Sequence, residues 1–117
     1  MNAIAIDFDG VISDFTGNRP FDNLNPPVTG AIEAIRSYQD AGLNVVIYTT
    51  RAGSLKEVNY ISQWLRLYGL ENRRIEKIDI TNKKPPAIVY LDDRGWLFTG
   101  SFPTADEIKA FKTWKGF

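Results

Sequence analysis

The chain has 117 residues, of which 44% are hydrophobic and 24% charged, the size and composition of one soluble globular domain with a single core. Its 14 lysines and arginines balance its 14 aspartates and glutamates, so the net charge indicates neither a nucleic acid nor a membrane surface as a partner. The absence of histidine and cysteine excludes Ser-His-Asp triads, cysteine nucleophiles and zinc sites made of imidazole or thiolate, and leaves carboxylates, lysine, hydroxyls and oxygen-binding cations for any chemistry.

The first half of the chain predicts a strand, a helix and a second strand. The apolar runs AIAI (3–6) and NVVIYT (44–49) are typical of parallel strands that are buried on both faces. Between them, apolar residues recur at helical spacing over 29–41, and Gly42 follows as a helix stop. The pattern predicts a one-sided helix joining two buried strands.

A second helix is predicted from Ser54, which is followed three residues later by Glu57 in the pattern of a capping box. It ends before Gly69, and its predicted apolar stripe consists of Leu55, Val58, Ile61, Leu65 and Tyr68.

The rest of the chain predicts three more strands and a final helix. The strands are KIDIT (77–81), AIVYL (87–91) and a short edge strand WLF (96–98), and the helix begins at Thr104 with a second capping-box pattern. This order predicts one Rossmann-like α/β domain over 1–117, with an open, mostly parallel sheet and helices on both faces.

Polar residues follow each of the three long apolar strands, namely Asp7 and Asp9, Thr49 and Thr50, and Asp92 and Asp93. Ligands of open α/β sheets bind outside the carboxyl ends of the strands, so these side chains are expected to lie together. Clustered carboxylates repel one another unless a cation lies among them, and Mg²⁺ is the simplest cation for a site without histidine or cysteine. Because protein-bound Mg²⁺ usually shares its ligand sphere with a substrate phosphate, the pattern predicts phosphoryl chemistry.

Two further residues support this prediction. Lys84 precedes the third strand in KKPPAIVYLDD, where its ammonium would neutralise a phosphate; Lys83 is the alternative. Gly10 permits a sharp turn after the aspartates, which would aim backbone amides at phosphate oxygens.

The segments DFDGV, VVIYTTR, KKPPA and YLDDR occur in this order, and through them the chain resembles the haloacid dehalogenase-like (HAD) phosphohydrolases. LDDR also resembles the phosphatase domain of polynucleotide kinase-phosphatases. The resemblance implies a phosphatase that depends on Mg²⁺. Most relatives insert a cap domain, for which this chain has no room, so the segment 11–28, rich in glycine, asparagine and proline, is the predicted flap over the site.

The resemblance also implies a role for each catalytic residue. Asp7 would be the nucleophile that forms an aspartyl-phosphate. Asp9 would protonate the leaving group and then activate water. Thr49 and Lys84 would bind the phosphoryl group.

The same resemblance implies the ligands of the metal. The Asp7 carboxylate, the backbone carbonyl of Asp9 and Asp93 would hold Mg²⁺. Asp92 would lie behind them, out of direct contact with the ion.

Two other functions remain open. A phosphorylatable signalling domain of the receiver type also combines acidic residues, threonine and lysine on a parallel sheet, although its acidic pair lies on the first strand and here the adjacent pair comes late. A non-catalytic binding module is the other alternative.

The predicted partner is a phosphorylated small molecule, with a nucleic-acid 3′-phosphate as the alternative. Five basic residues could form a strip for a polyanion, although a solvated face is the simpler explanation: Arg73, Arg74, Lys77, Lys83 and Lys84. The aromatic C-terminal part is predicted to be mostly core, with a share covering a homo-oligomer interface: Trp96, Phe98, Phe102, Phe111, Trp114 and Phe117. No leader-like or membrane-spanning segment is recognised, so the sequence predicts a cytoplasmic protein without a membrane partner.

Overall fold

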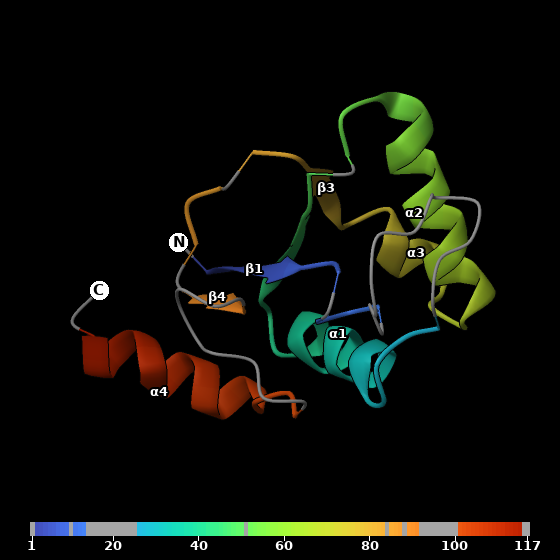
Figure 1. Ribbon diagram of the computed structural model, residues 1–117. Helices are drawn as coiled ribbons and strands as arrows, with labels where there is room; N and C mark the ends of the chain where they lie inside the picture. The colour runs from blue at the N-terminus through green and yellow to red at the C-terminus, as the bar shows by residue number, and fades with distance from the viewer. Residues whose placement is uncertain are drawn as a thin grey trace.

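Four parallel strands form one sheet in the order β3-β2-β1-β4 (Figure 1). They are β1 (Ala3–Asp7), β2 (Asn44–Tyr48), β3 (Asp79–Thr81) and β4 (Val89–Leu91). The computed structural model describes residues 2–9, 11–13, 26–50, 52–83, 85–87, 89–91 and 101–115, and only the backbone of 111–115. The predicted α/β class and parallel sheet are confirmed, while the predicted edge strand 96–98 lies outside the described residues.

The helices are α1 (Ala31–Asp40), α2 (Leu55–Leu67), α3 (Asn72–Ile75) and α4 (Ala105–Lys115). The sequence pattern does not predict α3, because four residues with the sequence NRRI are too few to carry an apolar period. None of the helices in the described ranges is both long and apolar enough to span a membrane.

The predicted helix boundaries rest on local hydrogen bonds. The Glu57 N–H donates to Ser54 Oγ at 3.4 Å, which caps α2. At α4 the capping box is complete, since the Thr104 N–H donates to Glu107 Oε1 at 2.9 Å and the Glu107 N–H donates to Thr104 Oγ1 at 3.1 Å. Gly42 has a φ of +85°, a conformation that favours glycine and ends α1 as predicted.

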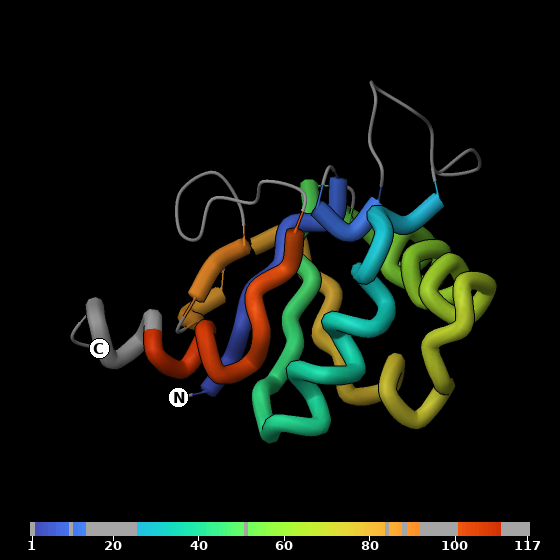
Figure 2. The backbone as a smooth tube through the Cα atoms, turned by 90° about the horizontal axis from the view of Figure 1, so that it is seen from below, coloured from blue at the N-terminus to red at the C-terminus, as the bar shows by residue number. Residues whose placement is uncertain are grey.

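One face of the sheet carries the core. Alternate strand residues point to this face in register: Ile4, Ile6, Val45, Ile47, Val89 and Leu91. All four helices add buried side chains to the same core. Figures 1 and 2 show α1 and α4 side by side against the strands, where the Tyr38 hydroxyl of α1 donates to the Pro103 carbonyl at 2.7 Å.

On the opposite face of the sheet, the cover seen in the described ranges comes from the connection between β3 and β4. Ala5 and Val46 are buried there, and the Tyr90 hydroxyl donates to the Pro85 carbonyl of the β3–β4 connection at 2.5 Å. A right-handed crossover requires this connection to pass over that face, because β4 lies on the far side of β1. Within the described ranges no helix lies there, since 82–88 is too short for a crossover helix and contains two consecutive prolines.

Helix α2 buries a narrower stripe than predicted. Ile61, Trp64 and Leu65 are buried, whereas Leu55 and Tyr68 are exposed at the two ends of the predicted stripe. Figure 1 shows α2 beside the short strand β3, at one end of the sheet, so only its central part has core beneath it. At the C-terminal end, Phe102 is half-buried against the core, and the other aromatic side chains of the predicted interface lie outside the description.

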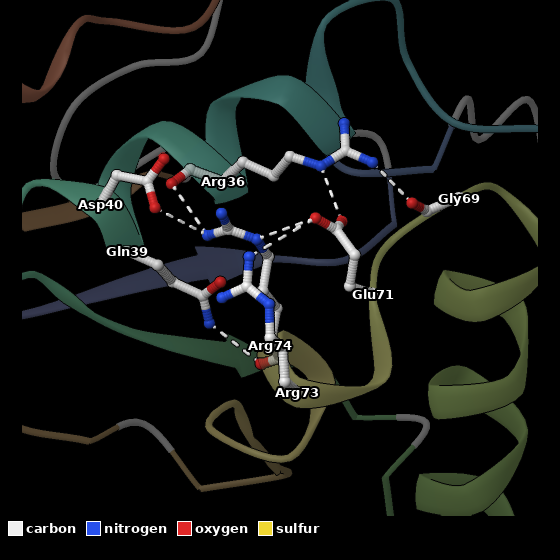
Figure 3. A network of polar contacts seen from close by, with 7 residues as sticks. All are labelled: Arg36, Gln39, Asp40, Gly69, Glu71, Arg73 and Arg74. Carbon is white, nitrogen blue, oxygen red and sulfur yellow. Dashed lines mark hydrogen bonds and ion pairs between the residues drawn. The ribbon is translucent and has the colours of Figure 1, made fainter.

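A network of charged residues ties α1 to α3 at the edge where the strands begin (Figure 3). Arg36 Nε donates to Glu71 Oε1 at 2.8 Å, and Arg74 Nε donates to Glu71 Oε2 at 3.2 Å. Arg74 also donates from Nη1 to Asp40 Oδ1 at 2.9 Å, and its side chain is 10% exposed. These contacts hold α3 against α1, although α3 is too short to have an apolar stripe of its own.

This network makes stability depend on pH through Glu71. The hydrogen bond from Arg36 lowers the pKa of Glu71 from 4.5 to about 2, with a further contribution from Arg74. A depressed carboxyl pKa stabilises the fold above the unfolded value, so this contribution is complete above pH 4.5 and is lost as the pH falls toward 2. Urea unfolding across that range should show a steeper loss of stability for the native chain than for Glu71→Gln. A Glu71→Gln variant as pH-sensitive as the native chain would contradict this account, and Glu76→Gln is the control outside the network.

Candidate active site

The carboxyl ends of three strands meet at one edge of the sheet. Asp7, the last residue of β1, lies opposite Tyr48, the last residue of β2. The Phe8 N–H donates to the Tyr48 carbonyl at 3.2 Å, and the Thr49 N–H donates to the Thr81 carbonyl at 3.0 Å. The structure therefore brings Asp7 and Thr49 to the same edge, as the sequence predicts for polar residues at strand ends.

Asp9 lies in a tight turn that the core holds in place. The Phe8 carbonyl accepts hydrogen bonds from the Ile12 N–H at 3.0 Å and the Ser13 N–H at 2.9 Å. Phe8 and Ile12 are completely buried and Ser13 is 2% exposed, whereas Asp7 and Asp9 are half-buried. Buried residues on both sides of Asp9 fix the backbone that carries it, so the two aspartates have a defined separation.

The turn also limits how much of the segment 11–28 can act as the predicted flap. Val11, Ile12 and Ser13 are buried, and the Val28 N–H donates to the Ile12 carbonyl at 2.8 Å. Ser13 pairs with both Asp9 and Pro27 in isolated β-bridges. The two ends of the segment thus belong to the fold beneath the site, while 14–25 lies outside the described residues.

Thr49 is buried at this edge, with 2% of its surface exposed, and Thr50 after it is exposed. Because so little of Thr49 is exposed, only a small part of its surface is available to contact a bound group at this edge. Thr81 of β3 belongs to the same edge, and its Oγ1 accepts the Lys83 N–H at 3.1 Å. The sequence prediction omitted Thr81, although its place at the end of the strand KIDIT follows the rule that found the other residues.

Lys84, Asp92, Asp93 and Gly10 lie outside the described residues, so their predicted roles remain predictions. Strand β4 ends at Leu91, opposite Ile6, immediately before the acidic pair in sequence.

Lys83 is described and exposed. It lines a hollow of about 500 Å³ on the face of the sheet opposite the core, together with Val46, Asp79 and the two prolines of the β3–β4 connection.

The described part of the predicted metal site consists of oxygen donors. Asp7 and Asp9 lie at the edge, and within the described ranges no group of three or more histidine, cysteine, aspartate or glutamate residues is placed to hold an ion. A donor set of carboxylates and carbonyls, in a chain without histidine and cysteine, fits a hard cation such as Mg²⁺.

The four basic residues of the predicted strip that the structure describes do not form one strip. Arg73, Arg74 and Lys77 come before β3, and Lys83 comes after it, so they lie at opposite ends of that strand. Arg74 is also 9% exposed and is engaged in the network around Glu71. The structure therefore separates three of these cations from the edge that carries Asp7 and Asp9.

The fold and the described part of the candidate site define an α/β domain with acidic and hydroxyl side chains at the carboxyl edge of a parallel sheet. No family model and no curated protein matches the chain. Among solved structures, a conserved protein from Bacteroides thetaiotaomicron is similar, with a TM-score of 0.57 and 21% sequence identity over 98% of this chain and 92% of that one. At this identity the likeness shows a shared fold over nearly the full length of both chains.

Proposed function

We propose that the chain is a phosphomonoester hydrolase that depends on Mg²⁺, a phosphatase of the haloacid dehalogenase-like type. The observation that carries the proposal is the placement of Asp7 and Asp9 on a rigid turn at the carboxyl edge of the sheet, beside Thr49. One carboxylate on the strand end and a second two residues later provide a nucleophile and a proton carrier from a single short segment.

The proposed reaction has two steps. In the first, a carboxylate oxygen of Asp7 forms a bond to phosphorus, the bond from phosphorus to the ester oxygen breaks, and Asp9 gives its proton to that departing oxygen. In the second, Asp9 takes a proton from water, the water oxygen attacks phosphorus, and the bond to Asp7 breaks. Phosphate is released, and both carboxyl groups return to their starting protonation states.

The remaining residues of the proposal would hold the cation and stabilise the negative charge of the substrate phosphate. Mg²⁺ would be held by Asp7, the Asp9 carbonyl and Asp93, and when bound it neutralises charge on the phosphate. Thr49 would donate one hydrogen bond to a phosphoryl oxygen from the floor of the edge, and Lys84 would neutralise a second one.

The strand order bears on the receiver-type alternative. The observed order β3-β2-β1-β4 follows the Rossmann order 3-2-1-4, in which the second strand separates the first from the third. The receiver-type alternative belongs to folds of the order 2-1-3-4-5, in which the third strand lies beside the first. This difference favours the hydrolase over the signalling domain.

We propose a phosphorylated small molecule as the substrate of a cytoplasmic enzyme. A nucleic-acid 3′-phosphate is the second candidate, and the separation of Arg73, Arg74 and Lys77 from the active edge weakens it, because those cations are not available to track a polyanion there.

Metal removal tests the proposal. The purified chain should hydrolyse a generic aryl phosphate, lose that activity in EDTA and regain it when Mg²⁺ is added in excess. A panel of sugar phosphates, nucleotides and 3′-phosphorylated oligonucleotides, assayed in the same way, identifies the substrate class. No turnover on the whole panel, or turnover indifferent to EDTA, would refute the proposed function.

A further inference from the structure

Two side-chain hydroxyls hold the connection between β3 and β4 at the two residues next to Lys84. Thr81, the last residue of β3, accepts the Lys83 N–H at its Oγ1 at 3.1 Å. The Tyr90 hydroxyl, from β4, donates to the Pro85 carbonyl at 2.5 Å. Lys83 and Pro85 are the neighbours in sequence of Lys84, the phosphate-binding lysine of the proposed function. The sheet thus holds the backbone one residue before this lysine and one residue after it.

Both hydroxyls belong to the face of the sheet to which Asp7 points. Residues paired in register in a parallel sheet point to the same face. Thr81 pairs with Tyr48, and Tyr48 pairs with Asp7. Tyr90 pairs with Ala5, two residues before Asp7. The strand residues that alternate with these point into the core, so Asp7 and both hydroxyls share the opposite face, with roughly 10 Å, two strand spacings, between Asp7 and Thr81.

Thr81 also connects the two predicted phosphate contacts to each other. Its carbonyl accepts the Thr49 N–H at 3.0 Å, and its Oγ1 accepts the N–H of Lys83. Two of the residues that follow are prolines, which have no backbone N–H to donate, so the connection has fewer ways to attach itself to the sheet. One residue therefore joins the strand end that carries Thr49 to the segment that carries Lys84.

We propose that Thr81 and Tyr90 are positioning residues for Lys84, and through it for the phosphoryl group at Asp7. The inference rests on the proposed function and assigns the two hydroxyls no contact with the substrate. A lysine side chain is long and flexible, so the place that its ammonium reaches depends on where its backbone is held. Hydrogen bonds on both sides of Lys84 restrict that backbone, which reduces the cost of bringing the ammonium to the phosphate.

Removal of each hydroxyl tests the proposal. Thr81→Val and Tyr90→Phe remove the oxygen and keep most of the side-chain volume. Each should lower kcat/KM on an aryl phosphate about tenfold, because a displacement of about 1 Å can cost as much as a hundredfold. Thr81→Ser keeps the hydroxyl and should stay within about twofold of the native value. Tyr68→Phe, which removes a hydroxyl at the C-terminal end of α2, is the matched control and should change nothing.

Two further backgrounds separate positioning from a loss of stability. Once Lys84→Ala has removed the ammonium, Thr81→Val and Tyr90→Phe should each change kcat/KM by less than about twofold, because residues that act through one group are not additive. In the Lys83→Ala background, which keeps the backbone N–H at position 83, the full losses should persist. A loss of stability alone would lower the rate equally in all three backgrounds.

Hydrogen exchange checks the contact at Lys83 without any substrate. The Lys83 amide should exchange about fivefold faster in Thr81→Val than in the native chain, as expected for the loss of one hydrogen bond. Thr81→Ser should leave the exchange rate unchanged.

The role of the two hydroxyls and the proposed function fail on different results. Equal losses in the native and Lys84→Ala backgrounds, native rates in Thr81→Val and Tyr90→Phe, or a Lys83 amide indifferent to Thr81→Val would each overturn the positioning role and leave the phosphatase in place. A native chain without metal-dependent turnover would refute the phosphatase, and the positioning role with it.

Discussion

Replacing Asp7 with asparagine is expected to lower the rate of phosphate ester hydrolysis by a factor of at least about a thousand. The amide is a poor nucleophile and carries no charge for a cation. Asp7 is half-buried at the end of a paired strand, and asparagine has nearly the same volume, so the fold should remain intact. The turnover number on an aryl phosphate, with circular dichroism as the check on folding, measures the effect.

Two companion variants define what this result means. Asp9→Asn should lower the rate by about a hundredfold to ten-thousandfold, with the smallest loss for esters whose leaving group needs no proton. Asp79→Asn, an exposed aspartate at the opposite end of β3, should leave the rate unchanged. If Asp7→Asn retains native turnover, Asp7 is not the nucleophile and the proposed mechanism is wrong.

Replacing Phe8 with alanine is expected to reduce the free energy of unfolding by about 3–5 kcal/mol. The Phe8 side chain is completely buried, and its ring lies 5.0 Å from the ring of Trp64 at an interplanar angle of 74°. Phe8 also separates Asp7 from Asp9, so a cavity beneath the turn should lower turnover in the folded fraction. Urea unfolding and the turnover number, measured on the same preparation, report the two effects.

Two control variants accompany Phe8→Ala, one that removes less buried volume and one that removes an exposed side chain. Phe8→Leu keeps most of the buried volume and should cost less than about 2 kcal/mol. Leu67→Ala removes a side chain that is 76% exposed and should change stability by no more than about 0.5 kcal/mol. Similar losses for Phe8→Ala and Leu67→Ala would show that Phe8 does not anchor the turn.

Much of the fold could be predicted because its signals are local. Apolar runs of β-branched residues mark the strands, and the capping residues Ser54 and Thr104 mark the starts of two helices. The burial of α2 was predicted less well, because Leu55 and Tyr68 fit the helical period but lie beyond the core at the end of the sheet. The connection that contains Pro85 is too short for a crossover helix, so within the described ranges the helices pack on the face that carries the core.

The functional residues and the charged contacts likewise include some that could be predicted from the sequence and some that could not. Asp7, Asp9 and Thr49 were predictable, because the ends of parallel strands meet at one edge whatever their separation in sequence. The charged network between α1 and α3 was not predictable, since it depends on pairings such as Arg74 with Asp40, 34 residues apart and without any periodic pattern. The buried Gln39 Oε1, which has no hydrogen-bond partner among the described residues, is likewise a property of packing and leaves no trace in the sequence.

The most direct test of the central claim is to locate the phosphoryl group during turnover. The reaction is quenched in acid while substrate remains, the acyl phosphate is reduced with borohydride, and the peptides are sequenced by mass spectrometry. We expect homoserine at position 7, present during turnover and absent once the substrate is exhausted, because Asp9 activates water against the intermediate. Turnover without a reduced residue at position 7 would contradict the claim, and an acyl phosphate that persists for minutes after the substrate is gone would instead identify a receiver-type domain.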